Sequence, residues 1–457
     1  MLPINLEIFK AYDIRGIYGQ DFDNEMAYLL GLAFVELRKS DSDYKAGEKL
    51  QIAVGRDMRL SSPLLKDNLI RGLIEAGADA VDLGLVSTPT FYFAVAKYKY
   101  NGGIMISASH NPKEWNGFKL VRAGGAPVSG ETGIKFIKEK IELNHFLPSP
   151  EKGEILFNDT ALKDELNYTW SLIDKTKIKN LKIVADTANG MGATYLEPIL
   201  AIIPGEAIPL NFKLDGNFPA HEADPLKEEN LEELKKEVLK QKADFGISTD
   251  GDGDRVFFID NLGETINPAI IRGLLAQSFL ADKPGAKIGY DVRPGKITPD
   301  LITAAGGIPI ITRVGHSLIK EQMIKEDIYF AGESSGHFYF NSDLGCFEFP
   351  SLMILRLLTI FSSSNLPISD QIKPYNKYYQ SGEINRTVND KGSVFASIEK
   401  KYSDGIINNL DGVTITYPDF WFNVRGSNTE PKIRLNLEAV SQEIMEIKKN
   451  EVLELIK

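Results

Sequence analysis

The sequence contains one cysteine, Cys346, among its 457 residues, and it has no long apolar run. An intrachain disulfide needs two thiols, so disulfide-rich secreted scaffolds are excluded and a reducing compartment is favoured. The most apolar stretches, at 269–281 and 350–361, are interrupted by Arg272 and Arg356. Neither reaches the roughly 20 apolar residues of a membrane-spanning helix. The first fifteen residues carry both acidic and basic side chains and lack the continuous apolar core of a signal peptide. We therefore expect a cytoplasmic protein.

Positive charge is also in deficit. There are 52 lysines and arginines against 63 aspartates and glutamates, which gives a net charge of −11. Proteins that bind polyanions usually carry a basic excess, so we expect neither nucleic acid nor a membrane as partner. A small anionic substrate in a locally basic cleft remains possible. The balance of 43% hydrophobic and 25% charged residues indicates a globular chain, and its length predicts about three domains.

A strand–helix unit occurs three times, at residues 50–84, 181–203 and 286–314. Each copy begins with a short apolar run that ends in aspartate, followed by a small or basic turn and a stretch of helical period. In the first and third copies, glycines near the helix end (Gly77 and Gly306) precede another apolar run. This order is typical of βαβ units with a parallel sheet. Three copies predict three similar α/β domains.

The C-terminal part has a different pattern. From about residue 370 it alternates strand-like and helical segments, which predicts a small α+β domain. Segments rich in Pro, Ser or Gly, at 147–153 and 362–370, are expected to be linkers, and the second could serve as a hinge. The expected fold class is α/β, with three similar domains whose sheets are mixed and a C-terminal α+β domain. The predicted domains are 1–153, 154–260, 261–368 and 369–457.

The first loop with chemical potential is SASHNP, residues 107–112, which follows the apolar run GGIMI. Asn111-Pro112 is a turn dipeptide, so Ser109 is expected on an exposed turn beside His110. A serine in that setting can act as a nucleophile or carry a phosphoryl group. The segment does not match the G-x-S-x-G pattern of hydrolases. Taken alone, a turn or helix-cap serine is the alternative.

The second loop is TDGDGDR, residues 249–255, between two apolar strands. Asp250, Asp252 and Asp254 repel one another unless a cation joins them, and carboxylate oxygens suit Mg²⁺ or Ca²⁺. An EF-hand is excluded because Arg255 and Asn261 occupy the positions that need Gly and Glu. The motif of haloacid dehalogenases, which needs Thr near Asp254, is also missing. A solvated acidic turn remains the alternative.

The third loop is GESSGH, residues 332–337, after the apolar run IYFA. Glu333 and Ser335 can form hydrogen bonds with hydroxyl groups, and His337 can contact an anion or a proton. This pattern is weak on its own, because an ordinary loop has the same composition.

The fourth loop is RGSNTEPKIR, residues 425–434. Its guanidinium, hydroxyl and backbone N–H groups can together bind a phosphate. The residues concerned are Arg425, Ser427, Asn428 and Thr429. The GK[ST] of a P-loop is missing, and a basic surface turn is the alternative.

Taken together and in this order, the four loops resemble those of the α-D-phosphohexomutase superfamily, in its phosphomannomutase/phosphoglucomutase branch. They resemble its phosphoserine loop (with Ser107 where Thr is usual), its metal loop, its sugar loop and its phosphate loop. The segments FKAYDIRGIYG (9–19), NGFKL (116–120) and VGHSLIK (314–320) are similar as well. The likeness runs from about residue 9 to residue 435.

The resemblance implies three α/β domains and a C-terminal domain of TATA-binding-protein-like fold around a central cleft. It also implies that hexose 1-phosphate and hexose 6-phosphate, of mannose and/or glucose, are interconverted through a hexose 1,6-bisphosphate, which also serves as activator. Ser109 would carry the phosphate. Mg²⁺ would be held by Asp250, Asp252, Asp254 and an oxygen of phosphorylated Ser109.

The resemblance also assigns residues to the reaction, which requires a donor in line, neutralised charge and positioning. Lys119 is the expected general acid/base, because a desolvated lysine beside cations can have a lowered pKa, and Arg15 is expected to orient the reacting groups. The expected catalytic residues are Ser109, Lys119, Arg15 and His110. The expected substrate-binding residues are Tyr12, Arg255, Arg293 (where Lys is usual), His316, Glu333, Ser335, His337, Arg425, Ser427, Asn428, Thr429 and Arg434.

Other interpretations remain. Phosphoglucosamine mutase is the alternative within the superfamily, although GESSGH and RGSNTEP argue against it. A non-catalytic sugar-phosphate-binding protein would be expected to lose the serine or a metal carboxylate, and all are present. A metal-dependent phosphatase would release free phosphate. The segment DGNFPAHEADP (215–225) has no assigned chemical role, and either a monomer or a homodimer is expected.

Overall fold

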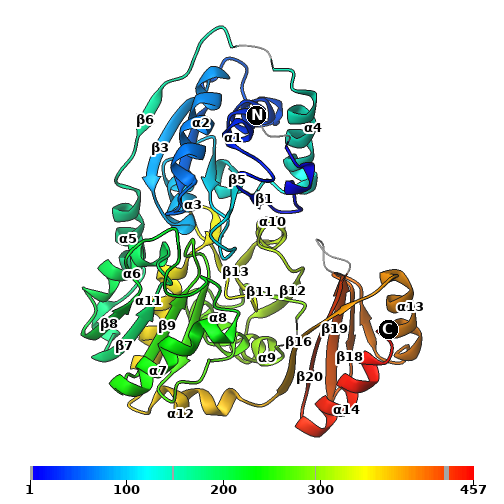
Figure 1. Ribbon diagram of the computed structural model, residues 1–457. Coiled ribbons are helices and arrows are strands. Elements are labelled where there is room, and N and C mark those ends of the chain that lie inside the picture. Colours follow the sequence, from blue (N-terminus) through cyan, green and yellow to red (C-terminus); the bar gives the residue numbers. More distant parts are fainter. Residues whose placement is uncertain (1–3, 147–148, 294, 427–431, 457) are drawn as a thin grey trace. The chain divides into compact units, whose positions relative to one another are not determined.

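The structure, a computed structural model, describes residues 4–146, 149–293, 295–426 and 432–456. The chain, drawn in Figure 1, contains two compact units. Unit 1 consists of the residues up to Ile266 together with Ser335–Ser369, and unit 2 consists of Asn267–Ser334 and the residues from Asp370 onward. Every helix within the described ranges is too short or too polar to pass through a lipid bilayer.

The first sheet of unit 1 has six strands in the order β1-β5-β4-β2-β3-β6. These are β1 (Ile14–Ile17), β2 (Gln51–Arg56), β3 (Asp79–Leu85), β4 (Gly102–Ile106), β5 (Trp115–Arg122) and β6 (Ile155–Phe157). β2, β3, β4 and β6 are parallel, whereas β5 is antiparallel to both β4 and β1. The sheet is therefore mixed, and the turn between β4 and β5 contains Ser109.

Helices cover both faces of this sheet. They are α1 (Asn24–Ser40), α2 (Ser62–Glu75), α3 (Thr88–Lys97) and α4 (Lys135–Leu143). Side chains of α1, α2 and α4 share one hydrophobic core with Ile52, Ile104 and Phe118 of the sheet. On the opposite face Phe91 of α3 packs so closely against Gly103 that a Cβ there would lie 2.8 Å from its ring. Alternate strand residues thus face two helical layers, as the period of a strand requires.

The second sheet of unit 1 has four strands in the order β10-β9-β7-β8. They are β7 (Leu181–Asp186), β8 (Gly205–Leu210), β9 (Phe245–Thr249) and β10 (Val256–Asp260). β9 and β10 are antiparallel neighbours, so they hold the acidic loop as a hairpin. The remaining elements of this unit are α5 (Ala161–Ser171), α6 (Gly192–Leu200), α7 (Glu232–Gln241), β14 (Phe338–Asn341), β15 (Cys346–Glu348) and α11 (Pro350–Ser362).

Unit 2 contains three parallel strands and a separate antiparallel sheet. The parallel strands are β11 (Lys287–Asp291), β12 (Ile308–Thr312) and β13 (Ile328–Gly332), accompanied by α8 (Pro268–Asp282), α9 (Ile297–Ala304) and α10 (His316–Glu326). The antiparallel sheet has the order β16-β20-β19-β18-β17. Its strands are β16 (Tyr379–Thr387), β17 (Ile406–Asn408), β18 (Val413–Thr416), β19 (Phe420–Gly426) and β20 (Lys432–Ala439). Helices α13 (Lys391–Lys401) and α14 (Gln442–Leu453) share one core with it (Figure 1).

Short segments complete the chain. Helix α12 (Ile368–Ile372) spans the boundary between the units, and single turns occupy Leu6–Ile8, Ala123–Gly125, Gly130–Ile134, Lys175–Lys177, Glu228–Leu231 and Lys373–Tyr375.

The three sequence repeats occupy equivalent places. In each one a strand (β2, β7 or β11) leads through a helix to a parallel neighbour (β3, β8 or β12). A third parallel strand (β4, β9 or β13) pairs with the first strand on its other side. SASHNP, TDGDGDR and GESSGH begin where these third strands end. The carboxyl ends of parallel strands are where α/β sheets bind ligands. The repeat therefore explains why the three motifs occupy equivalent positions.

The mixed sheets and the C-terminal antiparallel sheet confirm the predicted fold class. The boundaries at 153, 260 and 368, and the arrangement around a central cleft, stay predictions.

Candidate active site

Ser109 lies on a turn with unusual backbone geometry. Its φ of 49° falls in the left-handed region, which residues other than glycine rarely adopt. Its amide donates a hydrogen bond of 2.9 Å to Ser107 Oγ. The expectation that Ser109 is exposed is wrong, because only 2% of it is accessible. The acidic loop covers it: a Cβ on Gly251 would lie 2.5 Å from the carbonyl oxygen of Ser109.

The hydroxyl of Ser109 faces the acidic loop. Its Oγ donates a hydrogen bond of 2.7 Å to Asp250 Oδ2. His110 Nδ1 lies 3.2 Å from the same Oγ. Burial, together with the nearby Arg255 and Arg15, lowers the pKa of His110 well below its usual value, so the imidazole is neutral. The predicted phosphoryl carrier and the predicted metal loop are therefore in direct contact.

The three carboxylates of the loop are all buried and offer oxygens within 4.8 Å of one another. Burial and the charges of Asp254 and Asp252 raise the pKa of Asp250 well above its usual value. Burial alone would raise the pKa of Asp254 too, but Lys119 and His337 hold it well below the ordinary range. Asp252 Oδ1 is buried without a hydrogen-bond partner. A hard divalent cation fits this set, because it would engage that oxygen and compensate three crowded charges.

The loop is held in shape from two sides. The amides of Asp254 and Arg255 donate to Asp250 Oδ1 at 3.1 and 3.2 Å. Thr88, at the start of α3, donates its hydroxyl to Asp252 Oδ2 at 2.6 Å and its amide to the Asp252 carbonyl oxygen at 3.1 Å. Sequence reasoning missed Thr88, since Ser87-Thr88-Pro89 is an ordinary helix start. Nothing in that pattern indicates a partner 164 residues away.

Lys119, on β5, is buried between two of the carboxylates. Its Nζ lies 2.6 Å from Asp252 Oδ2 and 2.5 Å from Asp254 Oδ2. Burial alone would lower the pKa of Lys119, but the two carboxylates raise it well above its usual value. The expectation of a lowered pKa is therefore wrong in this structure, because the groups around the ammonium are anions.

Arg15 lies close to the Ser109 turn in space. Arg15, on β1, donates to Asn111 Oδ1 at 2.6 Å and to Asp13 Oδ2 at 2.5 Å. Its strand pairs with β5, with Arg15 opposite Gly117. Tyr12 is half-buried just before β1. The structure thus brings Arg15 to the turn that carries Ser109.

Two residues of the GESSGH motif reach the acidic loop within unit 1. His337 pairs with Arg255 through a backbone bridge, and its Nε2 lies 3.2 Å from Asp254 Oδ1. Ser335 Oγ is 3.0 Å from His337 Nδ1. Arg255 in turn lies 3.9 Å from Asp250. The motif that looked weakest in the sequence is therefore joined to the predicted metal loop.

The first half of the same motif lies in unit 2. Glu333 accepts a hydrogen bond of 3.0 Å from Arg293, which also bonds Asp291 Oδ2. Burial would lower the pKa of Arg293, but these two carboxylates raise it above its usual value. Ser334 donates its amide and its hydroxyl to Asp291, both at 2.9 Å. Glu333 and Arg293 thus contact each other, and the Ser334 hydroxyl is committed to Asp291.

Arg425 and Arg434 lie opposite each other on β19 and β20. Both contact Glu383, at 3.4 and 3.2 Å. Burial and the neighbouring Arg293 lower the pKa of Arg425. His316 begins α10. The other predicted members of the phosphate loop, Ser427, Asn428 and Thr429, lie outside the described residues.

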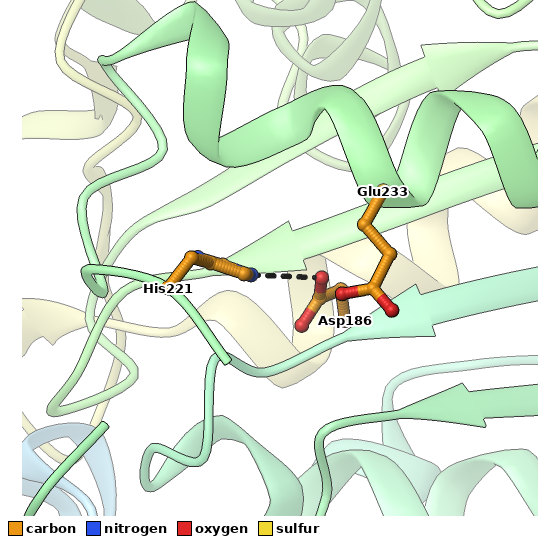
Figure 2. A group of neighbouring side chains, drawn as sticks. All are labelled: Asp186, His221 and Glu233. Carbon is orange, nitrogen blue, oxygen red and sulfur yellow. Dashed lines mark hydrogen bonds and ion pairs between the residues drawn. The ribbon is translucent and has the colours of Figure 1, made fainter. Parts of the chain in front are cut away.

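A second cluster of possible metal ligands lies in unit 1 (Figure 2), made of Asp186, His221 and Glu233. His221 Nε2 is 3.0 Å from Asp186 Oδ2, and its Nδ1 is 2.8 Å from the carbonyl oxygen of Glu222. Burial would lower the pKa of His221, but its hydrogen bond with Asp186 raises it. The hydrogen bond between His221 and Asp186 fastens the 215–225 segment to the end of β7.

The sequence matches the four domain families of phosphoglucomutase/phosphomannomutase. The three alpha/beta/alpha domains match at residues 6–147, 161–263 and 267–378, and the C-terminal domain matches at residues 383–455.

Full-length relatives agree with these matches. A phosphomannomutase of Methanocaldococcus jannaschii is 39% identical over 99% of this chain and 98% of its own length, and one of Vibrio cholerae is 38% identical over the same shares. A phosphoglucomutase/phosphomannomutase family protein of Burkholderia thailandensis has a solved structure that superimposes with a TM-score of 0.89. It is 31% identical and covers 100% of this chain and 98% of its own. Matches of this extent, on a chain that joins a buried serine to an acidic loop, show that the protein belongs to the phosphoglucomutase/phosphomannomutase family of phosphohexomutase enzymes.

Proposed function

We propose that this enzyme interconverts the 1-phosphate and 6-phosphate of mannose and glucose through a phosphoryl group carried on Ser109. The observation that supports this most strongly is the 2.7 Å contact between Ser109 Oγ and Asp250. A serine hydroxyl bonded to one carboxylate of an acidic cluster is an unusual arrangement, because these anions repel a phosphoryl group unless a cation neutralises them. The site is therefore suited to handling phosphate only together with a metal ion.

We assign that cation to Asp250, Asp252 and Asp254, with Mg²⁺ as the ion. When bound, Mg²⁺ would neutralise the charge that develops on the transferring phosphoryl group. The orphaned Asp252 Oδ1 and the oxygen-only donor set support this assignment.

In the proposed reaction the bond between Ser109 Oγ and phosphorus breaks, and a bond from phosphorus to a sugar hydroxyl oxygen forms. The sugar hydroxyl loses its proton, and Ser109 regains one when its phosphate has left. In the return step the bond between the other phosphorus of the bisphosphate and its sugar oxygen breaks, and a bond from that phosphorus to Ser109 Oγ forms. Ser109 loses its hydroxyl proton and the released sugar oxygen gains one, which yields the isomeric monophosphate. Lys119 contributes a positive charge beside the acidic loop, whereas its part as a general acid/base stays a prediction from the family resemblance.

The phosphate that does not react is assigned to Arg425, with Arg434 beside it. A buried guanidinium is suited to this task, because it donates several hydrogen bonds and keeps its charge. Glu333 and Ser335 are assigned to the sugar hydroxyls. The single buried Cys346 supports the predicted cytoplasmic location, and the choice between monomer and homodimer stays a prediction.

The test combines mass spectrometry with a product assay. The intact mass of the wild-type protein should include one phosphate group. Ser109→Ala should remove both this added mass and the mutase activity. Ser171→Ala, at an exposed position on α5, is the control and should change neither. Steady release of inorganic phosphate from hexose phosphates, in place of isomerised sugar phosphate, would indicate a phosphatase. Full mutase activity in Ser109→Ala would rule out Ser109 as the carrier.

A further inference from the structure

The backbone of the Ser109 turn is held by one buried guanidinium group, that of Arg59. Its Nη1 donates hydrogen bonds to the carbonyl oxygens of Pro112 and Trp115, at 2.7 and 3.0 Å. Its Nη2 donates to the carbonyl oxygens of Ser109 and Asn111, at 2.8 and 2.6 Å. Three of the acceptors belong to the connection between β4 and β5, and the fourth, Trp115, is the first residue of β5. Arg59 is 0% exposed, so water cannot replace these bonds.

The conformation of the turn requires such support. Ser109 has a φ of 49°, a conformation that carries strain in a residue with a side chain. Strained residues persist only where their surroundings over-determine them. Here the amide of Ser109 is fixed by Ser107 Oγ and its carbonyl by Arg59. Several carbonyl dipoles also converge on one point, an arrangement that a cation stabilises and that would otherwise be repulsive.

The guanidinium is itself locked in place. Its Nε lies 3.2 Å from Asp57 Oδ2, and Asp57 Oδ1 accepts the amide of Arg59 at 3.0 Å. The ring of Phe218 covers the guanidinium at 5.0 Å from the ring centroid. Gly216 lies so close that a Cβ there would meet the Cα of Arg59 at 2.9 Å. Arg59 therefore has little freedom to move away from the turn.

The 215–225 segment, which contains Gly216 and Phe218, also reaches the acidic loop. A Cβ on Gly251 would lie 3.5 Å from the Phe218 ring and 3.4 Å from the Cβ of Ala223. The hydrogen bond between His221 and Asp186 fastens this segment at its middle (Figure 2). Arg59 is thus enclosed between the turn that carries Ser109 and a segment anchored on the second sheet.

We infer that Arg59 is a positioning residue, which directs Ser109 Oγ toward Asp250 by holding the backbone carbonyls of the turn. It does not contact the Oγ itself, so it acts through the backbone. This inference rests on the proposed role of Ser109 as phosphoryl carrier. The role requires an arginine. The four carbonyls need a planar fork of two donor nitrogens, whereas the ammonium group of a lysine has one nitrogen.

A matched control exists in helix α1, which packs against the same sheet. Arg38 is 1% exposed, donates to the carbonyl oxygen of Asn101 at 2.8 Å, and pairs with Asp41 and Asp43. These hydrogen bonds and ion pairs of Arg38 do not involve the Ser109 turn. Arg59→Lys and Arg38→Lys are therefore the same chemical change at two equally buried sites, of which one supports the turn.

The experiment measures kcat, KM and thermal stability, together with the ³¹P NMR signal of the phosphorylated protein. Misplacement of a reacting group by about 1 Å can cost about a hundredfold in rate. Arg59→Lys should therefore lower kcat by about a hundredfold, change KM by less than about threefold, and shift the phosphoserine resonance. Arg38→Lys should lower stability while kcat and the resonance stay at the wild-type values.

Wild-type kcat in Arg59→Lys, a change confined to KM, or an equal fall of kcat in Arg38→Lys would overturn the inference. If Arg59→Lys does not fold, Phe218→Leu provides the second test, since it loosens the cover of the guanidinium and leaves its charge intact. It should lower kcat in the same direction, and wild-type kcat there would also count against Arg59. Absence of phosphate from Ser109 in the wild-type protein would instead contradict the proposed function.

Discussion

The hydroxyl of Thr88 donates a 2.6 Å hydrogen bond to Asp252 Oδ2, and the Thr88 amide donates to the backbone carbonyl of the same residue. Both ends of Asp252 are thus fixed by the first residue of α3. The side-chain bond leaves Asp252 Oδ1 as the oxygen without a partner. Thr88, together with Lys119 on the same Oδ2, therefore leaves Oδ1 as the oxygen of Asp252 that is free for a metal ion.

Replacing Thr88 by Val should weaken Mg²⁺ binding by about ten- to a hundredfold, the range seen when a group that orients a metal ligand is lost. Thr88→Ser keeps the hydroxyl and should bind like the wild type. Asp252→Asn, which removes a proposed ligand, should lose at least as much as Thr88→Val. Calorimetric titration with Mg²⁺ measures this directly. Equal affinities in Thr88→Val and wild type would show that the hydrogen bond has no part in metal binding.

Glu165 should make stability depend on pH. It is fully buried between Thr90 and Ser351, and burial raises its pKa from 4.5 to about 7. Between these values the unfolded chain has lost a proton that the folded protein keeps, so the free energy of unfolding falls as pH rises through this window. The loss amounts to about 3 kcal/mol.

Glu165→Gln cannot ionise and should lack this decline. Urea unfolding at pH 5 and pH 8 should therefore show the variant gaining on the wild type at the higher pH. Glu131→Gln, at an exposed pair with Lys135, is the control and should follow the wild type. A constant difference between Glu165→Gln and wild type at both pH values would mean that Glu165 does not titrate in this window.

Arg425→Ala should weaken binding of hexose 1-phosphate and hexose 6-phosphate alike, because one site is proposed to hold whichever phosphate does not react. A charge-assisted hydrogen bond contributes about 1.5–3 kcal/mol, which corresponds to about a tenfold to hundredfold change in Kd. Arg386→Ala, at an exposed position on β16, should leave both affinities unchanged. Binding measured separately for the two substrates decides the matter, and an effect on only one of them would contradict a shared site.

Mannose 1-phosphate and glucose 1-phosphate should both be converted. The two sugars differ only at C2, and strong rejection of one epimer needs a buried polar group that it leaves unpaired. Ser334 cannot supply such a group readily, because its hydroxyl is bonded to Asp291. We expect values of kcat/KM within about two orders of magnitude, or about 3 kcal/mol. Glucosamine 1-phosphate is the third substrate to compare, and a preference for it would show that the sugar loop is misassigned.

The sequence predicted the parts of the fold that repeat. Apolar runs ending in aspartate, followed by a helical stretch, mark β2, β7 and β11 because local periodicity reports strands and helices directly. The separate α+β domain at the C-terminus followed from the same patterns. The motif loops could be placed at strand ends, since each one directly follows an apolar run.

The properties that depend on distant contacts could not be predicted in this way. Ser109 looked exposed because its turn is short and polar, yet Gly251, far along the chain, packs on its carbonyl. Lys119 was expected beside cations, and it lies between two carboxylates of another sheet. Arg59 precedes the turn that it binds by about 50 residues, as the bond to Ser109 shows, and nothing local marks it as a partner. Such contacts are set by tertiary packing and leave no periodic pattern.

The path of the chain between the units has a consequence for how the protein is made. Unit 1 is completed only by residues Ser335–Ser369, which include α11. Phe361 of that helix packs on Phe245 with ring centroids 5.3 Å apart, and Ser351 bonds the buried Glu165 at 3.0 Å. A nascent chain that has emerged from the ribosome only as far as Ile266 therefore has a core that is not yet covered by α11. Closing such a long loop is slow and leaves apolar surface open meanwhile, so a chain shortened to end at Ile266 should aggregate instead of yielding an independent half.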